Sequence, residues 1–366
     1  MLRRSSLFPI IALFTVIASF GAGSHAASDS PAQFERCWSV VESDRRFTLA
    51  SSGNELVIGA TDDAKLVAIE SHEGKKLWST DLGGGLMSGI ASTGDMVFVV
   101  TGPSASGESG PLTLRAVKAQ TGVPTWVADL PGGGASRLLS LSGVVIASTE
   151  LGDISAFSAV DGRLLWRFRM ANGISAIAAI DDRSLVLASG SRVTVLSPAT
   201  GEAVATIETS FTEIAVVDSM SSGDVLVGDS SGRLASLSRT DGRRSWQLRL
   251  GGKVSGSIRI DGGLIVSSHD NFVYRIDASG HVAWKRRMDG RIVCVERIGG
   301  DNLVVVSLDS RRGVLLNLRN GRSTSQIELP TEPDGASVAA IGPASFSVAL
   351  GGEIVSYAPV CDNKRR

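Results

Sequence analysis

The stretch Leu66-Val-Ala-Ile-Glu-Ser-His-Glu-Gly-Lys-Lys-Leu-Trp78 decides the fold of this chain. Its alternating apolar and polar residues predict a strand, then a turn that ends at Gly74, then a second strand that carries Trp78. The same phrase returns at Leu114 to Trp126, Ile154 to Trp166, Leu234 to Trp246 and Val273 to Trp284. A phrase that recurs at a fixed period indicates a repeat architecture.

The repeats follow one another at intervals close to 40 residues. The turn glycines are Gly74, Gly122, Gly162, Gly201, Gly242, Gly280 and Gly321. Four residues after them stand Trp78, Trp126, Trp166, Ala205, Trp246, Trp284 and Ser325. Five of these seven positions hold Trp in a chain with only six Trp, so the spacing does not come from chance. A period near 40 residues made of strands predicts an all-β propeller with four-stranded antiparallel blades.

Each repeat divides into four short strands separated by turns. After Trp78 come a glycine-rich break, a short strand over Leu86–Ala91 and a strong strand over Met96–Thr101. Period-two alternation, β-branched residues, and Gly, Asp or Asn at the breaks favour strands over helices. The small residues of Gly102–Pro111 form an insertion, for which a flexible spacer and a binding loop are both consistent interpretations.

The two ends of the chain complement each other. The final repeat offers strands at Ser337–Ile341, Phe346–Leu350 and Glu353–Ala358, and it has no Trp strand. Near the start, the segment Phe34–Val41 carries Trp38, which lies 40 residues before Trp78 and so in phase with the series. We therefore expect the N-terminal strand to complete the last blade and to close a ring of eight blades.

The cysteines support this closure. Aligning Trp38 with Trp78 places Cys37 and Cys361 on opposite sides of the turn of the closing blade, so we expect a disulfide between them. The bond would close a loop of about 325 residues, for which chain entropy gives an upper limit of about 6 kcal/mol. Cys294 alternates with apolar neighbours and is expected to be a buried free thiol. The alternative is that all three cysteines are reduced.

Residues 1–27 are expected to be a secretory signal peptide, and residues 28–366 a single propeller domain. The segment starts with two arginines, continues with the short apolar stretch Leu7–Phe20 and ends with small residues that suit cleavage. The apolar run of about 14 residues is shorter than the roughly 20 of a membrane span, although an uncleaved anchor is the alternative. The mature protein is then exported, to the periplasm or the extracellular space, with no span after cleavage.

The repeated residues have structural explanations. A large flat side chain at a fixed place in the outer strand would fill the wedge between neighbouring blades, and its loss would cost roughly 3–5 kcal/mol if it were fully buried. Ala205 and Ser325 lack this filler, so their repeats must pack differently or be less stable. The turn glycines would supply a positive φ in a tight hairpin.

No motif for catalysis or for metal binding stands out. His72, His269 and His281 have no metal-ligand spacing to one another, and the nucleophile, dithiol and calcium-loop patterns are missing from the sequence. The pairs Asp62-Asp63 and Asp181-Asp182 lie in turns, where Asp is expected for conformational reasons. The sequence therefore names no catalytic, cofactor-binding or metal-ligating residue.

Charge is balanced overall and uneven locally. The chain has 36 Lys and Arg against 37 Asp and Glu, so nucleic acid is not an expected partner. The segment from Arg239 to Arg322 holds 16 basic and eight acidic residues. It is either a set of solvated outer strands and turns or a basic sector that meets an acidic partner or an anionic lipid surface.

The recurring phrase resembles the repeat of the pyrroloquinoline-quinone (PQQ) type propellers. Val67-Ala68-Ile69, Gly74 and Trp78 match that repeat, and so does the phrase from Ile154 to Trp166. The resemblance covers nearly the whole chain after the expected signal segment, and it is more specific for the fold than for the activity. One branch of the family, the quinoprotein dehydrogenases, binds PQQ and calcium at the propeller centre; those chains are longer, and many carry adjacent cysteines.

The other branch is BamB-like and belongs to the machinery that assembles outer-membrane β-barrel proteins. The resemblance to this branch implies an exported, non-enzymatic, eight-bladed protein. Our first hypothesis is a scaffold without a cofactor that binds protein partners through loops or strand edges, and we expect it to be a monomer. Those partners would include outer-membrane assembly components, and the protein would lie at the periphery of the outer membrane. The alternatives are a PQQ-dependent dehydrogenase and a propeller that senses a ligand in its central channel.

Overall fold

The computed structural model describes residues 33–42, 45–103, 110–131, 134, 136–141, 143–333, 335–342 and 345–361. They belong to one compact unit, Ala32–Arg366, which folds as strands without a helix in the described part. Among these residues there is accordingly no helix with the length and apolar content of a membrane span. The expected signal segment, residues 1–27, lies outside the described residues.

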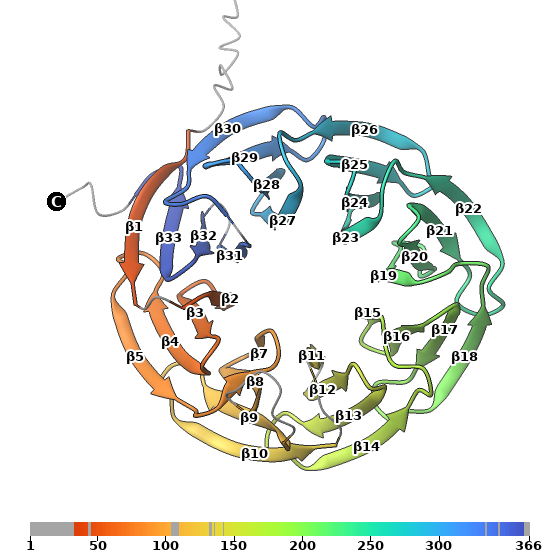
Figure 1. Cartoon of the computed structure of the whole chain (residues 1–366), viewed down its shortest axis with the longest axis horizontal. Helices are drawn as coiled ribbons and strands as arrows, with labels where there is room; N and C mark the ends of the chain where they lie inside the picture. The colour runs from red at the N-terminus through yellow and green to blue at the C-terminus, as the bar shows by residue number, and fades with distance from the viewer. Residues whose placement is uncertain are drawn as a thin grey trace, which may run out of the picture. The chain divides into compact units, whose positions relative to one another are not determined.

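Eight antiparallel sheets form a ring around a central channel (Figure 1), which confirms the predicted eight-bladed propeller. The strands of each blade are given from the innermost outward. Blade 1 is β2 (Phe47–Ser52), β3 (Leu56–Thr61), β4 (Lys65–Glu70) and β5 (Lys76–Asp81). Blade 2 is β6 (Gly85–Leu86) with β7 (Ala91–Thr93), then β8 (Met96–Gly102), β9 (Leu112–Lys118) and β10 (Pro124–Leu130). Blade 3 is β11 (Ser136–Leu141), β12 (Val144–Thr149), β13 (Asp153–Ser158) and β14 (Leu164–Arg169). Blade 4 is β15 (Ala176–Asp181), β16 (Ser184–Ser189), β17 (Arg192–Leu196) and β18 (Ala203–Glu208).

The second half of the ring repeats this order. Blade 5 is β19 (Ile214–Ser219), β20 (Val225–Asp229), β21 (Arg233–Leu237) and β22 (Arg244–Arg249). Blade 6 is β23 (Val254–Ile260), β24 (Gly263–Ser268), β25 (Phe272–Asp277) and β26 (Val282–Arg287). Blade 7 is β27 (Ile292–Ile298), β28 (Asn302–Ser307), β29 (Arg312–Asn317) and β30 (Ser323–Glu328). Blade 8 is β31 (Ser337–Ile341), β32 (Ser345–Leu350), β33 (Glu353–Ala358) and β1 (Glu35–Val41).

The N-terminal strand closes the ring as expected. β1 is the outer strand of blade 8 and pairs antiparallel with β33, with Trp38 opposite Ser356. Cys37 and Cys361 are joined by a disulfide, and their Cα atoms are 5.2 Å apart. Each chain end is thereby held to the other by backbone hydrogen bonds and by one covalent bond.

Blade 2 departs from the predicted pattern. The expected continuous strand over Leu86–Ala91 is wrong, because the inner strand is split into β6 and β7, both of which pair with β8. The Met87 N–H donates to the Val100 carbonyl (2.8 Å), whereas the Val100 N–H donates to Ser88 Oγ (2.9 Å). A side-chain oxygen thus replaces a backbone carbonyl, and the chain bulges at this point.

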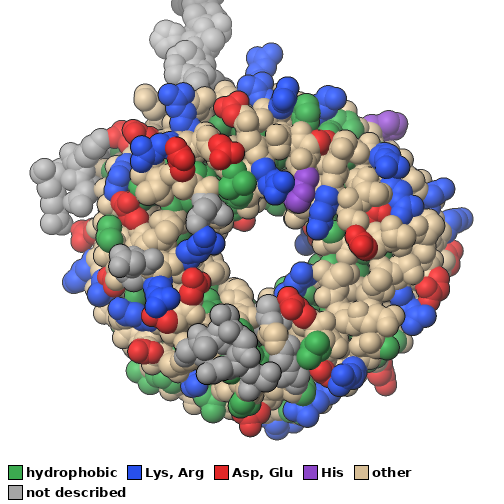
Figure 2. Space-filling view, viewed as in Figure 1, with side chains coloured by type: hydrophobic (Ala, Val, Ile, Leu, Met, Phe, Trp, Pro, Cys, Tyr) green, Lys and Arg blue, Asp and Glu red, His purple; other side chains and the backbone are tan. Residues whose placement is uncertain are grey.

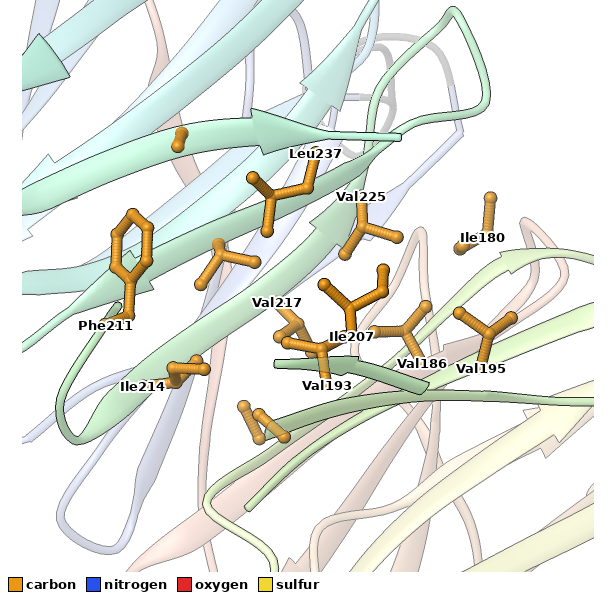
Figure 3. Close-up of a cluster of buried hydrophobic side chains, with 14 residues drawn as sticks. Ile180, Val186, Val193, Val195, Ile207, Phe211, Ile214, Val217, Val225 and Leu237 are labelled. Carbon is orange, nitrogen blue, oxygen red and sulfur yellow. The ribbon is translucent and has the colours of Figure 1, made fainter. Parts of the chain in front are cut away.

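The apolar core lies between the blades as a series of separate clusters. Figure 3 shows one of them, in which Val186 and Val193 of blade 4 pack against Val217 and Val225 of blade 5. These residues come from strands whose side chains alternate between two sheet faces, and both faces are covered by neighbouring blades. Burial on both faces explains why the second strand of every blade is almost entirely apolar or small.

A contact between an indole and a glycine joins six of the blade pairs. Each Trp of one blade covers the turn glycine of the next, in the pairs Trp38–Gly74, Trp78–Gly122, Trp126–Gly162, Trp166–Gly201, Trp246–Gly280 and Trp284–Gly321. A Cβ atom added at these glycines would lie 2.5–2.7 Å from the indole. Each indole N–H also donates to a backbone carbonyl of the same turn, over 2.8–3.2 Å. The turns therefore need glycine for space as well as for their positive φ of 66–88°.

The two positions without Trp have different explanations. In blade 4 the seam is filled by Ile207, whose Cγ2 would lie 2.5 Å from a Cβ atom on Gly242, so this blade packs differently, as one of the two expectations for Ala205 has it. In blade 7 the neighbour is the closing blade, where two chain ends meet and no hairpin turn exists. There the Phe34 N–H approaches Ser325 Oγ at 3.5 Å.

The indoles differ in burial. Trp38 and Trp166 are buried, at 8% and 9% exposure, whereas the other four are only partly buried. The cost of roughly 3–5 kcal/mol expected for the loss of a fully buried Trp therefore applies to the first two at most.

Candidate interaction surfaces

The antiparallel blades divide their loops between two opposite faces of the ring. One face, which we call the turn face, carries the turns inside the inner and the outer strand pairs, such as residues 53–55 and 71–75 of blade 1. The other, the connection face, carries the turns between the two middle strands and the links from blade to blade, such as residues 62–64 and 82–84. Any partner that binds through loops meets one of these two sets.

The residues singled out by the repeat lie in the seams between blades. The six Trp and seven Gly come together in neighbouring pairs around the outer part of the ring, and Cys37 meets Cys361 at the outer corner of blade 8. The six Trp–Gly pairs and the contact of Gly242 with Ile207 join neighbouring blades at seven places, and the disulfide links two strands within blade 8. Their arrangement stabilises the ring.

The central channel is open through the ring, and charged side chains surround its mouth (Figure 2). On the connection face, a hollow of about 500 Å³ is lined by Arg137, Glu213, Lys253 and His269 among others. The Arg137 guanidinium donates to the Ser175 carbonyl (2.8 Å), which directs it across the start of β15. This hollow is lined by one arginine, one lysine, one histidine and one glutamate.

The ionisation of this mouth follows from its neighbours. Partial desolvation and the positive charges of Arg291 and Lys253 lower the pKa of His269 below its ordinary value. The imidazole is therefore neutral at pH 7, and the permanent positive charge comes from the arginines and the lysine. One carboxylate oxygen of Glu213 accepts a hydrogen bond from Ser230 Oγ (2.8 Å).

The mouth on the turn face has mixed charge. A hollow of about 510 Å³ is lined by Asp181, Arg259, Asp261 and Arg297. The Arg259 guanidinium donates to the Ile180 carbonyl (2.8 Å) and to Ser219 Oγ, so it ties blade 6 to blades 4 and 5. Two acids balance two arginines here, which makes this mouth less selective for one sign of charge than the opposite one.

The channel wall holds one thiol that is not in a disulfide. Cys294 of β27 borders a small cavity of about 250 Å³ between blades 6 and 7. Burial and the nearby Glu296 raise the pKa of this thiol from its usual 9.0 to about 12. The thiol stays protonated at neutral pH and is a poor nucleophile.

The donor set that a quinoprotein needs for calcium is not assembled in the described part of the chain. No three His, Cys, Asp or Glu side chains of those residues lie close enough together to hold a metal ion. His281 Nδ1 contacts only its own turn, at 2.9 Å from Ser279 Oγ and 3.6 Å from Asp277 Oδ2. The described residues therefore supply no cluster of three such metal ligands.

The predicted basic sector, Arg239 to Arg322, spans blades 5–7 and is not one patch. Lys253 lies at the channel mouth, and the charge of Arg291 acts on His269 there, whereas Arg249 and Lys285 lie on the outer strands β22 and β26. Sequence reasoning missed Arg137, which comes from blade 3 and joins the same mouth. Nothing local in the sequence marks it, because only the closed ring brings blades 3 and 6 to one opening.

Comparisons with known proteins place the chain in a family. A family model described as "Outer membrane protein assembly factor BamB" matches residues 30–151, 62–222 and 189–355. The outer membrane protein assembly factor BamB of Yersinia pestis is 22% identical over an alignment of 315 residues, gaps included, which covers 72% of this chain and 80% of that protein.

Several solved structures share the fold. The crystal structure of BamB from Moraxella catarrhalis covers 89% of this chain and 98% of its own, with a TM-score of 0.64 at 20% identity. The computationally designed Ika8 protein (TM-score 0.76, 15% identity) and the C-terminal WD40 domain of Sif2 (0.73, 12%) also cover 89% of this chain, and 100% and 98% of their own. A designed protein and a WD40 domain match as well as BamB does, so the likeness of shape alone carries no function. The sequence matches, by contrast, run through all eight blades, and they show that the chain belongs to the BamB family of PQQ-repeat propellers.

Proposed function

We propose that this protein is an exported, non-catalytic scaffold that binds other proteins during the assembly of outer-membrane β-barrel proteins. The observation that carries the proposal is the family match, which extends over residues 30–355 and so over the whole ring. The relative from Yersinia pestis bears the name of an assembly factor. The partners of this chain would then be components of the outer-membrane assembly machinery.

The chemistry of the described surfaces supports binding over catalysis. The channel mouths carry arginines, a lysine and carboxylates that suit recognition of charged segments. The free thiol, with its pKa raised to about 12, is unsuited to nucleophilic attack. Export is supported by the Cys37–Cys361 disulfide, since such bonds persist in oxidising compartments.

Deletion of the gene in its source organism tests the proposal. The amount of folded outer-membrane barrel proteins should fall, which heat-modifiable mobility on gels would measure, and a plasmid copy of the gene should restore it. Co-purification of the tagged protein with assembly components, after crosslinking in cells, gives the matching biochemical result. Unchanged barrel levels together with no crosslinked component would contradict the proposal.

A second assay separates the scaffold from a quinoprotein dehydrogenase. The purified protein is mixed with PQQ and calcium, and dye-linked oxidation of alcohols and glucose is followed alongside the absorption spectrum. We expect no turnover and no spectral change of bound quinone. Turnover above that of the heat-denatured protein would show an enzyme and remove the non-catalytic part of the proposal.

A further inference from the structure

A groove in the outer wall of the ring, between blades 5 and 6, differs from its counterparts in the other blades. It has a volume of about 680 Å³ and runs between β22 and β26. Its apolar floor includes Phe272, Tyr274 and Trp284, and the rings of Phe272 and Tyr274 lie 5.9 Å apart. Phe272 is only partly buried, so an aromatic surface faces solvent at this place.

The repeat allows the same position to be compared from blade to blade. The residue three positions after the Trp position of the outer strand lies opposite a residue near the start of the third strand, and in four blades this pair has opposite charges. The pairs are Lys65–Asp81 in blade 1, Asp153–Arg169 in blade 3, Arg192–Glu208 in blade 4 and Arg312–Glu328 in blade 7. In blade 6 the pair is Phe272–Arg287. An aromatic ring thus replaces the charge that would neutralise the outer strand.

Blade 5 lacks the compensating acid as well. Its pair is Arg233–Arg249, and Arg233 is engaged by Asp229 at 2.8 Å. On the other side of the groove, the Lys285 ammonium lies 5.3 Å above the Phe272 ring, a cation–π contact that leaves its charge open to solvent. Within the described structure, none of Arg249, Lys285 and Arg287 forms an ion pair.

The single acid of the groove is already saturated. Asp270 Oδ2 accepts hydrogen bonds from the Tyr274 hydroxyl (2.6 Å) and the Gly251 N–H (2.9 Å), and Oδ1 accepts from the Phe272 N–H (3.1 Å). Desolvation and this carboxylate raise the pKa of Tyr274, so the phenol stays a donor to Asp270. Asp270 therefore shapes the groove and forms no ion pair with the nearby cations in the described structure. Its one negative charge is outnumbered by Arg249 and Lys285, which line the groove, and by Arg287, which lies opposite Phe272.

We propose that this groove binds an acidic, extended segment of a partner protein, which seats one apolar side chain against Phe272 and Tyr274 and directs carboxylates to Arg249, Lys285 and Arg287. The inference rests on the proposed function, because it names the class of partner that the scaffold receives. Charge complementarity selects an acidic segment. The groove lies beside β26, the last strand of its sheet, whose outer edge can pair with an extended peptide strand.

A peptide array on the purified full-length protein tests this docking site. Octapeptides carry zero to four Glu residues around a central Phe, Leu or Ser. We expect binding to rise with the number of Glu residues, to be at least about tenfold stronger with Phe or Leu than with Ser, and to weaken with added salt. An array in which acidic peptides bind no better than peptides with Lys in place of Glu would overturn the proposal.

The repeat supplies substitutions that the fold already accepts. Phe272→Thr introduces the residue type that blade 2 has at this position, Thr113, and Arg287→Glu the type that blade 7 has, Glu328. We expect the first to remove the preference for a central Phe or Leu and the second to lower the affinity for the four-Glu peptides about tenfold. Arg169→Glu, the same position in blade 3, is the matched control and should leave binding unchanged. If Arg287→Glu and Arg169→Glu lower the peptide affinity equally, the effect comes from the net charge of the protein and the groove is not the binding site.

Two further measurements test other occupants. Sedimentation velocity that shows dimers in the wild type and monomers in Phe272→Thr would assign the groove to a second copy of the chain. Stronger binding to phosphatidylglycerol vesicles than to the peptides, lost in Arg287→Glu, would assign it to lipid; either result overturns the proposal. Barrel levels after gene deletion report on the assembly role alone, so failure of one proposal is distinguishable from failure of the other.

Discussion

At the residue scale, the indole–glycine contact is the repeated unit of cohesion between blades. The glycine meets two requirements at once, because Gly162 has a φ of 71° and leaves room for Trp126 within 2.5 Å of an added Cβ. The sequence reveals the first requirement through the turn. It hides the second, because the indole comes from the preceding blade and its neighbour is set only by the geometry of the ring.

The double role of these glycines can be measured on Gly162. We expect Gly162→Ala to lower the free energy of unfolding by about 2–4 kcal/mol, since it adds a steric clash with Trp126 to the strain of a left-handed alanine. Gly262→Ala is the control, because Gly262 has a similar φ of 73° but nothing within 4 Å of an added Cβ. It should cost about 1 kcal/mol. Denaturant unfolding at equilibrium measures both, and equal losses would show that φ alone explains the glycine.

Glu296 of β27 gives the protein a specific pH dependence. Burial raises the pKa of its carboxyl above the usual value, so the folded state holds the proton to higher pH than the unfolded state does. The contribution of this group to stability is therefore full below pH 4.5 and is lost as the pH rises through the folded-state pKa. Glu296→Gln should stabilise the protein at pH 7 and have no such effect below pH 4.

Thermal melting of the wild type and the variant across pH 3.5–8 checks this expectation. Glu332→Gln, at an exposed position, is the control for the loss of one negative charge. A constant difference between Glu296→Gln and the wild type over the whole range would show that the carboxyl is not the group responsible.

At the element scale, the decisive feature is the outer strand of blade 8, which comes from the other end of the chain. The phase of Trp38 predicts that β1 joins β33, and the register with Trp38 opposite Ser356 agrees. The split of the inner strand in blade 2 could not be predicted, because it depends on Ser88 Oγ accepting the Val100 N–H. A side chain that competes with the backbone for one hydrogen bond leaves no periodic signal.

The disulfide at this junction should stabilise the ring. Cys37→Ser, or reduction of the wild type, removes a link across a sequence separation of 324 residues, and we expect a loss of up to about 6 kcal/mol and a lower melting temperature. Cys294→Ser is the control and should change stability much less, since this thiol is free. Mass mapping of unreduced peptides should link Cys37 to Cys361; a Cys37–Cys294 peptide would contradict the register of β1.

At the scale of the whole molecule, fold and function were unequally predictable. The period near 40 residues, the phase of Trp38 and the turn glycines specify eight blades and their closure, because each is a regular feature of the sequence. The groove with Phe272 and Arg287 and the mouth with Arg137 and Lys253 are exceptions to that regularity. They become visible only when equivalent positions of the blades are set beside one another in space.

The origin of β1 at the opposite end of the chain also constrains the timing of biogenesis. The strand β1 has no partner until β33 exists, and Cys37 and Cys361 are 324 positions apart in the sequence. At the usual synthesis rate of about 5–20 residues per second, β1 waits roughly 15–65 s for its neighbour. During that interval β1 has no strand partner and the Cys37 thiol has no disulfide partner, so each can react or pair with another part of the chain or with another protein. We therefore expect chaperones and thiol isomerases to have their greatest effect on this protein before its last forty residues are synthesised.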